Sequence, residues 1–198
     1  MKEFQTNADL PRLTTHGFEI IKCPQPAWGI IAELYSLLRK TAGVEEQFEG
    51  IDEFIGGDQT PDLFTLQQVP TIREIIHTQL KSWHEEWCKN PLIPTYIYGI
   101  RSYKKGATLA QHTDRIETHH ISSIIIVDKQ LKGEKDWPLD IQAHDGTWHK
   151  IYANPGDMIL YESAVCKHGR DEVFQGEWYR NFYVHYRLAD WKWIETQE

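Results

Sequence analysis

The stretch that decides the fold is RSYKKGATLAQHTD, residues 101–114. It continues an alternating run rich in Tyr and Ile over residues 95–103, and this alternation predicts a β-strand. The pair Lys105-Gly106 then predicts a turn before the segment ends in His112-Thr113-Asp114. Side chains of an extended segment alternate between two faces, so residues two apart point the same way. The imidazole of His112 and the carboxylate of Asp114 are therefore expected to meet at one point.

Further strands are predicted on the C-terminal side of this stretch. Short apolar or alternating runs, each followed by a turn signal rich in Gly, Pro, Asn or Asp, occupy residues 121–127, 139–142, 148–152, 157–161 and 179–187. Many short strands at such spacing are typical of a sandwich or barrel, and here they predict a jelly roll.

The N-terminal side has a different pattern. A short strand is expected at residues 18–22, and apolar residues at helical spacing predict helices over residues 27–40 and from Pro70 to a point before Asn90-Pro91. Residues 41–66 are acidic and glycine-rich, and we interpret them as a long loop that closes as a lid. Helices before strands indicate an α+β protein, mainly β, with the helices packed on one sheet.

The length of 198 residues indicates a single domain. Within it, residues 1–92 would form a helical support and residues 93–192 the jelly-roll core. The longest aliphatic run is residues 124–127, so no membrane span is expected, and the first residues contain no secretory signal. Three cysteines without a C-x-x-C pair favour a reducing, cytoplasmic location. A net charge of −8 argues against nucleic acid as a partner. No pattern in the sequence indicates the oligomeric state.

The H-x-D pair gains chemical meaning if a distant histidine joins it. His168 stands 56 residues after His112, which leaves room for the intervening strands. Two histidines and one carboxylate leave open positions on an octahedral metal, as non-haem Fe(II) oxygenases require. From these residues alone, a surface H-x-D pair and an unrelated loop histidine remain an open alternative.

Three segments resemble the prolyl 4-hydroxylase-like group of 2-oxoglutarate/Fe(II) dioxygenases. Residues 101–114 are similar to its R-x-Y-x-x-G-x-x-L-x-x-H-x-D segment, and residues 155–161, beginning Pro-Gly-Asp, are similar to the strand before its second histidine. His168-Gly169, with Gly176 further on, resembles the stretch that contains that histidine. The resemblance covers about residues 96–191.

This resemblance implies a jelly roll that holds Fe(II) through His112, Asp114 and His168, and it assigns Tyr103 to 2-oxoglutarate. The family's basic residue, about ten positions after the second histidine, binds the far carboxylate of 2-oxoglutarate. Here that position is Trp178, so we assign the role to Arg180, two residues on and on the same strand face. Arg170 is the alternative, and Arg101 is a more distant one.

The implied activity is hydroxylation of a C–H bond with O₂ and 2-oxoglutarate as co-substrates and with release of succinate and CO₂. A peptidyl prolyl residue, another amino-acid side chain or a small molecule remain possible substrates. Two other classes stay open: a non-catalytic jelly-roll sensor that binds iron, and a cupin-like metalloenzyme that does not use O₂. Among the remaining residues, we expect His119-His120 to be solvated in a turn, whereas Asn181 and His185, four apart on one strand, have the spacing to reach the pocket.

Overall fold

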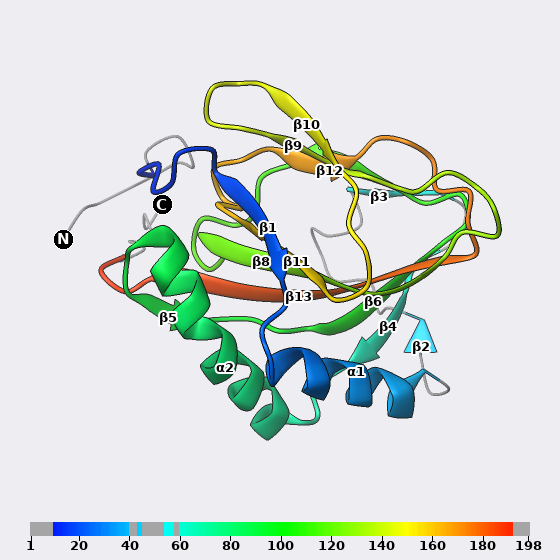
Figure 1. The fold of residues 1–198 in the computed structure, drawn as a ribbon, viewed down its shortest axis with the longest axis horizontal. Helices are drawn as coiled ribbons and strands as arrows, with labels where there is room; N and C mark the ends of the chain where they lie inside the picture. The colour runs from blue at the N-terminus through cyan, green and yellow to red at the C-terminus, as the bar shows by residue number, and fades with distance from the viewer. Residues whose placement is uncertain (1–9, 40–42, 45–53, 58–59, 192–198) are drawn as a thin grey trace, which may run out of the picture.

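The fold is a pair of antiparallel sheets with two helices, seen in a computed structural model that describes residues 10–39, 43–44, 54–57 and 60–191 (Figure 1). The helices are α1 (Ala27–Leu38) and α2 (Pro70–Cys88). The eight-stranded sheet contains, in spatial order, β1 (Phe18–Lys22), β11 (Asp157–Tyr161), β8 (Ile121–Gln130), β13 (Trp178–Leu188), β6 (Gly99–Lys104), β4 (Asp62–Thr65) and β2 (Gly43–Val44), while β5 (Leu92–Pro94) also pairs with β13.

The second sheet has five strands and lies on the other side of the larger sheet from the helices (Figure 1). Its order is β10 (Trp148–Ile151), β9 (Leu139–Gln142), β12 (His168–Arg170), β7 (Thr108–His112) and β3 (Ile55–Gly56). The predicted jelly roll with helices on one sheet is therefore confirmed. Strands β9 and β11 have the predicted bounds, and β8 and β13 begin or end within a few residues of them.

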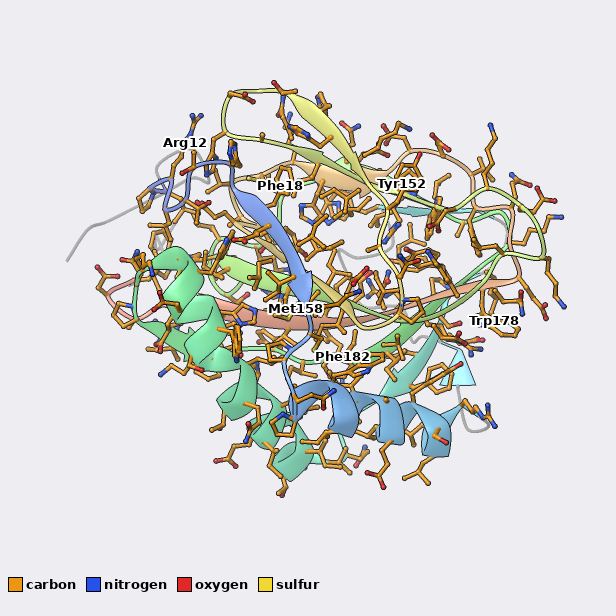
Figure 2. All side chains as sticks on the ribbon, viewed as in Figure 1. Arg12, Phe18, Tyr152, Met158, Trp178 and Phe182 are labelled. Carbon is orange, nitrogen blue, oxygen red and sulfur yellow. The ribbon has the colours of Figure 1, made fainter. Side chains whose placement is uncertain are left out.

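Two apolar clusters hold these three layers together. One fills the space between the helices and the larger sheet, where Ile31 and Ile76 of the helices join Phe182 of β13. Phe182 and Met158, which belongs to the same cluster, are labelled in Figure 2. The other cluster lies between the sheets and includes Tyr103 and Trp137. Burying each such side chain stabilises the fold by about 1.5–3 kcal/mol.

Both helices follow from their sequences. Pro70 is the first residue of α2, where its missing N–H costs no hydrogen bond. Its buried residues Ile76, Leu80 and His84 are spaced by four and face the sheet. The helix ends at Cys88, and the following residue, Lys89, has a φ of +54°, a left-handed conformation that terminates the helical hydrogen bonding.

The interpretation of residues 41–66 as a long loop is wrong for the part that the structure describes. β3 pairs with β7, β4 pairs with β6, and β2 pairs with β4, so this segment contributes strands to both sheets. Strands of two to four residues are too short to show a period in the sequence. Half of the predicted lid, residues 41–42, 45–53 and 58–59, lies outside the described residues, and the lid stays a prediction.

Two further expectations concern a membrane-spanning helix and the state of the cysteines. Across the described residues, neither helix has the length and apolar character needed to cross a membrane. All three cysteines, Cys23, Cys88 and Cys166, are buried and free.

Candidate metal centre

The two sheet strands β7 and β12 bring the predicted metal ligands together. His112, the last residue of β7, and His168, the first residue of β12, are direct partners in the antiparallel register. Asp114 follows β7, and its backbone N–H donates a 2.9 Å hydrogen bond to the carbonyl of Ser163, which fixes the chain just beyond the strand. The Asp114 Oδ1 atom lies 3.5 Å from His112 Nε2 and 3.6 Å from His168 Nε2. One ligand atom from each of the three residues lies within 4.8 Å of the others.

Backbone carbonyls set the tautomers of both histidines. His112 Nδ1 lies 2.8 Å from the carbonyl oxygen of Ala110, and His168 Nδ1 lies 2.9 Å from that of Cys166. A carbonyl only accepts, so each Nδ1 carries the hydrogen and each Nε2 presents a lone pair. This is the arrangement in which metal-binding histidines are oriented by their other nitrogen. The donor set of two imidazoles and one carboxylate therefore fits a divalent transition metal.

The protonation states suit the same role. Burial raises the pKa of Asp114, but the neighbouring imidazoles of His112 and His168 outweigh it, and the net pKa lies well below its usual range. Burial lowers the pKa of His168 to about 4, so its imidazole is neutral near pH 7. Metal ligands must be a charged carboxylate and neutral imidazoles, and Asp114 and His168 meet these conditions before any metal binds. Burial lowers the pKa of His112, but the neighbouring Asp114 raises it by more, so a proton on this imidazole is released when a metal binds.

The three ligands open into a cavity of about 720 Å³. Its wall includes apolar side chains from both sheets, among them Leu109, Ile124 and Leu139. The ring of Phe54 stacks on that of His112, with centroids 4.6 Å apart and an interplanar angle of 21°. The volume lies in the range of small-molecule sites, which are mostly apolar with a few convergent polar groups.

A buried arginine lies among aromatic rings at the same cavity. Arg170 is 1% exposed, and its guanidinium lies 4.7 Å from the ring centre of Trp137 and 4.6 Å from that of Tyr179. It donates a hydrogen bond to the carbonyl of Trp137, and no carboxylate of the described residues forms an ion pair with it. Near Arg170 and its two aromatic neighbours, the hydroxyls of Tyr103 and Tyr183 lie 3.1 Å apart, and both tyrosines line the cavity.

Comparison with known proteins adds structural neighbours only. No family model matches the sequence, and no curated protein matches it. Among solved structures, a prolyl-4-hydroxylase from Pseudomonas putida has 13% identity and a TM-score of 0.58, covering 87% of this chain and 94% of that one. HygX from Streptomyces hygroscopicus, with nickel, 2-oxoglutarate and hygromycin B bound, has 12% identity and a TM-score of 0.63, covering 90% and 85%.

A prolyl hydroxylase from Trichoplax adhaerens, in complex with a peptide fragment of hypoxia inducible factor, has 12% identity and a TM-score of 0.60, covering 87% of this chain and 84% of that one. The chain has the fold of 2-oxoglutarate/Fe(II) oxygenases. The resemblance seen in the three sequence segments is thus confirmed at the level of the fold.

Within this oxygenase fold, Arg180 does not reach the cavity. As expected, Arg180 and Trp178 share one face of β13, and the guanidinium lies 4.6 Å from the Trp178 ring centre. That face turns toward the helices, because Phe182 and Val184, which stand two and four residues after Arg180, belong to the helix-side cluster. Arg180 donates to Ser102 at 3.0 Å and to Tyr35, and it lies 3.5 Å from Asp128. Its assignment to 2-oxoglutarate does not fit this position.

The opposite face of β13 supplies residues to the cavity of the oxygenase fold. Tyr183 and His185 line it, because they stand four and six residues after Tyr179 of the inter-sheet cluster and therefore share its strand face. His185 thus reaches the pocket as its sequence position suggested, whereas Asn181 is buried but does not line the cavity. Tyr183 was not identified as a cavity residue from the sequence, although it lies midway between Asn181 and His185 on the same face of β13.

The expectation that His119-His120 is solvated is wrong. The two residues are 6% and 3% exposed, because the turn after the metal strand folds inward against β13. His120 Nδ1 accepts a 3.0 Å hydrogen bond from the Leu188 backbone. His119 lines the cavity, with its ring centre 3.9 Å from that of His185. A histidine pair in a polar turn has no periodic pattern that would reveal this burial.

Proposed function

We propose that the protein is a 2-oxoglutarate- and Fe(II)-dependent dioxygenase that hydroxylates a C–H bond of a small-molecule or peptide substrate. The observation that carries this proposal is the convergence of His112 Nε2, Asp114 Oδ1 and His168 Nε2 at the cavity. Both imidazoles already have the ligating tautomer. The overall reaction consumes 2-oxoglutarate, O₂ and R–H and yields succinate, CO₂ and R–OH.

His112, Asp114 and His168 would hold the iron, and the iron would supply the activation of O₂ that is coupled to oxidation of 2-oxoglutarate. The chain's own contribution is to fix the ligands, because the register of β7 and β12 and the two carbonyl contacts leave little freedom to either imidazole. Apolar side chains around the cavity exclude water from the reacting groups. HygX binds nickel and 2-oxoglutarate in the same fold, which supports the proposal.

Arg170, rather than Arg180, is proposed as the anchor for the far carboxylate of 2-oxoglutarate. A fully buried guanidinium without an ion pair is costly, and a bound carboxylate would compensate its charge through bidentate hydrogen bonds. Tyr103 lines the cavity beside it and packs edge-on against Trp137, the residue on which Arg170 stacks. Tyr103 keeps the co-substrate role assigned from the sequence, with its hydroxyl donating to the same carboxylate.

A cytoplasmic location is part of this proposal. Three buried free thiols are consistent with a reducing compartment, where Fe(II) also persists.

The test is a two-stage assay. Anaerobic protein with Fe(II) is titrated with 2-oxoglutarate, and binding is followed by the visible charge-transfer absorption of the complex. O₂ is then admitted, and succinate is measured against a panel of peptides and metabolites. Failure to bind 2-oxoglutarate in the metal-loaded state would overturn the proposal. Binding without succinate in any arm would assign the chain to the sensor class instead.

A further inference from the structure

Two buried serine hydroxyls connect a backbone carbonyl to the imidazole of His185 at the cavity. We propose that His185 is a specificity-determining residue, which presents a lone pair on Nε2 to the substrate and requires an N–H or O–H hydrogen-bond donor there. The expected substrate is therefore a molecule with a hydroxyl, amide or ring N–H group close to the metal centre. This inference rests on the proposed dioxygenase function and adds a substrate feature to it.

The hydrogen bonds of this chain of groups are all satisfied in one direction only. Ser163 Oγ lies 2.7 Å from the carbonyl oxygen of His119, and because a carbonyl only accepts, the hydroxyl hydrogen of Ser163 is used there. Ser122 Oγ lies 2.6 Å from Ser163 Oγ and must therefore donate to it. The oxygen of Ser122 then accepts a hydrogen bond from His185 Nδ1, which is 2.7 Å away. A hydrogen on Nδ1 leaves a lone pair on Nε2 of the neutral imidazole.

The surroundings of His185 favour the same tautomer. His185 is 5% exposed, and Ser122 and Ser163 are fully buried, so water does not compete for their hydrogen bonds. Burial disfavours the charged form of an imidazole, and the neutral form has a hydrogen on one nitrogen only. Nδ1 also lies 3.9 Å from Oδ2 of Asp114. Beside a negative carboxylate, a hydrogen on Nδ1 is more stable than a lone pair.

Nε2 is the nitrogen of His185 that is left for a ligand. His185 lines the cavity, and no hydrogen bond joins its Nε2 to any residue in the described part of the chain. Once a substrate displaces water from the cavity, an acceptor without a donor is destabilising. A substrate that brings an N–H or O–H group to Nε2 avoids this cost, and a site built in this way discriminates against analogues that lack the donor.

Neighbouring aromatic rings hold the imidazole of His185 in this orientation. Its ring centre lies 3.9 Å from that of His119, the Tyr98 ring meets it edge-on at 5.9 Å and 68°, and the Tyr183 ring is parallel to it at 6.4 Å and 3°. Tyr96, which is 43% exposed, stacks on His119 at 5.6 Å and 20° and extends this aromatic lining toward solvent. A flat molecule with one hydrogen-bond donor suits such a lining.

Ser163 connects the acceptor to the metal centre. Its hydroxyl begins the chain that ends at His185, and its backbone carbonyl accepts the 2.9 Å hydrogen bond from the N–H of Asp114. The same residue therefore positions a metal ligand and, through Ser122, the imidazole. A substrate donor on Nε2 is consequently held at a fixed place relative to the metal, and this determines which of its C–H bonds faces the reacting centre.

One experiment reads the tautomer of His185 directly. The full chain, labelled with ¹⁵N, is loaded with Zn(II), which has no redox chemistry, and is saturated with 2-oxoglutarate. Long-range proton–nitrogen NMR spectra then separate ring nitrogens that carry a hydrogen from those with a lone pair. We expect a hydrogen on Nδ1 and a lone pair on Nε2, with His185→Phe identifying the signals. A hydrogen on Nε2 would overturn the inference.

Serine variants show whether the chain of hydroxyls sets this tautomer. Ser122→Ala removes the acceptor of Nδ1, so the NMR signals of His185 should move toward a mixture of the two tautomers. Ser123→Ala is the matched control, because Ser123 is also fully buried in β8 but its Oγ has no hydrogen-bond partner among the described residues. Signals that stay unchanged in Ser122→Ala would contradict the proposed role of the chain.

A second experiment measures the preference for a donor with two pairs of flat probes of nearly equal shape. Indole is compared with benzofuran, and 4-ethylphenol with 1-ethyl-4-fluorobenzene, by NMR titration of the same Zn(II)-loaded sample. The member with the N–H or O–H group should bind roughly tenfold more tightly, and the two pairs show which kind of donor the site favours. Equal affinities within both pairs would reject the inference.

The variants assign the preference to His185. His185→Phe should bind both members of each pair equally, Ser122→Ala should show a reduced preference, and Ser123→Ala should keep it. Wild-type affinity for Zn(II) and 2-oxoglutarate verifies that each variant is folded. A donor preference that survives His185→Phe would place the acceptor elsewhere. Loss of Zn(II) binding in this variant with an intact fold would make His185 a metal ligand, which also contradicts the proposal.

The inference and the proposed function fail in distinguishable ways. If the Zn(II)-loaded protein does not bind 2-oxoglutarate, the dioxygenase proposal fails. The tautomer and the probe affinities are then measured in the metal-free protein, where a lone pair on Nε2 and a donor preference that depends on His185 would still support the acceptor site. Normal 2-oxoglutarate binding without any donor preference would leave the function standing and reject the substrate feature.

Discussion

His112 and His168 face each other directly across the antiparallel pair β7–β12, with their ring centres 4.5 Å apart. Their relative position is therefore set by backbone register and by one carbonyl contact at each Nδ1. Such a site is preorganised, since neither side chain has to change its tautomer or leave its strand position to bind an ion. Removing one imidazole should accordingly change the metal affinity far more than the fold.

This gives the first prediction. His112→Ala and His168→Ala should each lower the affinity for Mn(II) or Fe(II) by roughly 100-fold or more, because two ligands cannot hold the ion as three do. The affinity is measured by the loss of free Mn(II) signal in electron paramagnetic resonance, with circular dichroism as the check of folding. His149→Ala, on the exposed strand β10, is the control and should bind metal normally. Stoichiometric, tight binding by either ligand variant would reject the assigned triad.

The second prediction separates two arginines. Arg170→Gln should raise the 2-oxoglutarate concentration needed for half-saturation roughly 10- to 100-fold, since charge-assisted hydrogen bonds contribute about 1.5–3 kcal/mol. Arg180→Gln should leave that concentration unchanged and lower the thermal stability instead, because it loses contacts with Ser102 and Asp128 on the helix side. Anaerobic titration and thermal melting measure the two effects. The reverse pattern would return the anchor role to Arg180.

The position of Arg180 on the helix side of β13 shows what the sequence pattern alone does not reveal. The alternation of side chains along a strand correctly placed Trp178 and Arg180 on one face. When both faces of a strand are buried, alternation alone does not tell which face lines the cavity. β13 lies between two apolar layers, so its helix side and its cavity side are both covered. An apolar pattern that marks the core of a one-sided sheet is therefore uninformative here, and only the packing of the helices shows on which side Arg180 lies.

The proximity of His112 to Asp114 was predictable for a related physical reason. The H-x-D pattern requires only that two side chains close in sequence lie on the same side of the strand, and this is a local property. His168 was identified because His168-Gly169 resembles the family segment that contains the second histidine. The burial of His119 and the approach of Arg73 from α2 depend on contacts between distant segments. No local pattern of residues encodes such contacts, so these cavity residues came only from the structure.

The third prediction concerns the paired hydroxyls of Tyr103 and Tyr183. Tyr103→Phe removes one donor next to the proposed carboxylate site, so the affinity for 2-oxoglutarate should fall by roughly 3- to 10-fold, the value of one ordinary hydrogen bond of about 1 kcal/mol. Tyr179→Phe, whose hydroxyl faces the carbonyl of Ala153 at 3.5 Å, is the matched control and should not change the affinity. Calorimetric titration of both variants measures this difference. An identical affinity for Tyr103→Phe and the wild type would remove Tyr103 from the co-substrate site.

The fourth prediction is a loss of stability in mild acid that arises away from the metal centre. His84 is fully buried in α2, and burial lowers its pKa from 6.5 to about 4, against a smaller raising effect of its hydrogen bond to the Leu80 carbonyl. Between these two pH values the unfolded chain binds a proton at His84 that the folded chain does not. The stability contribution is therefore complete above pH 6.5 and is lost as the pH falls toward 4.

For His84 alone, the loss between pH 7 and pH 5 should be about 2 kcal/mol. Urea unfolding at the two pH values measures it in the wild type and in His84→Leu. The variant starts from a lower stability if its packing against Tyr186 suffers, but the comparison uses only the change with pH within each protein. Other buried histidines, such as His120, also contribute less to the free energy of unfolding as the pH falls over this range. Their contributions are the same in both proteins and cancel when the two pH dependences are compared. Equal pH dependence in the two proteins would show that His84 has the same pKa in the folded and the unfolded chain.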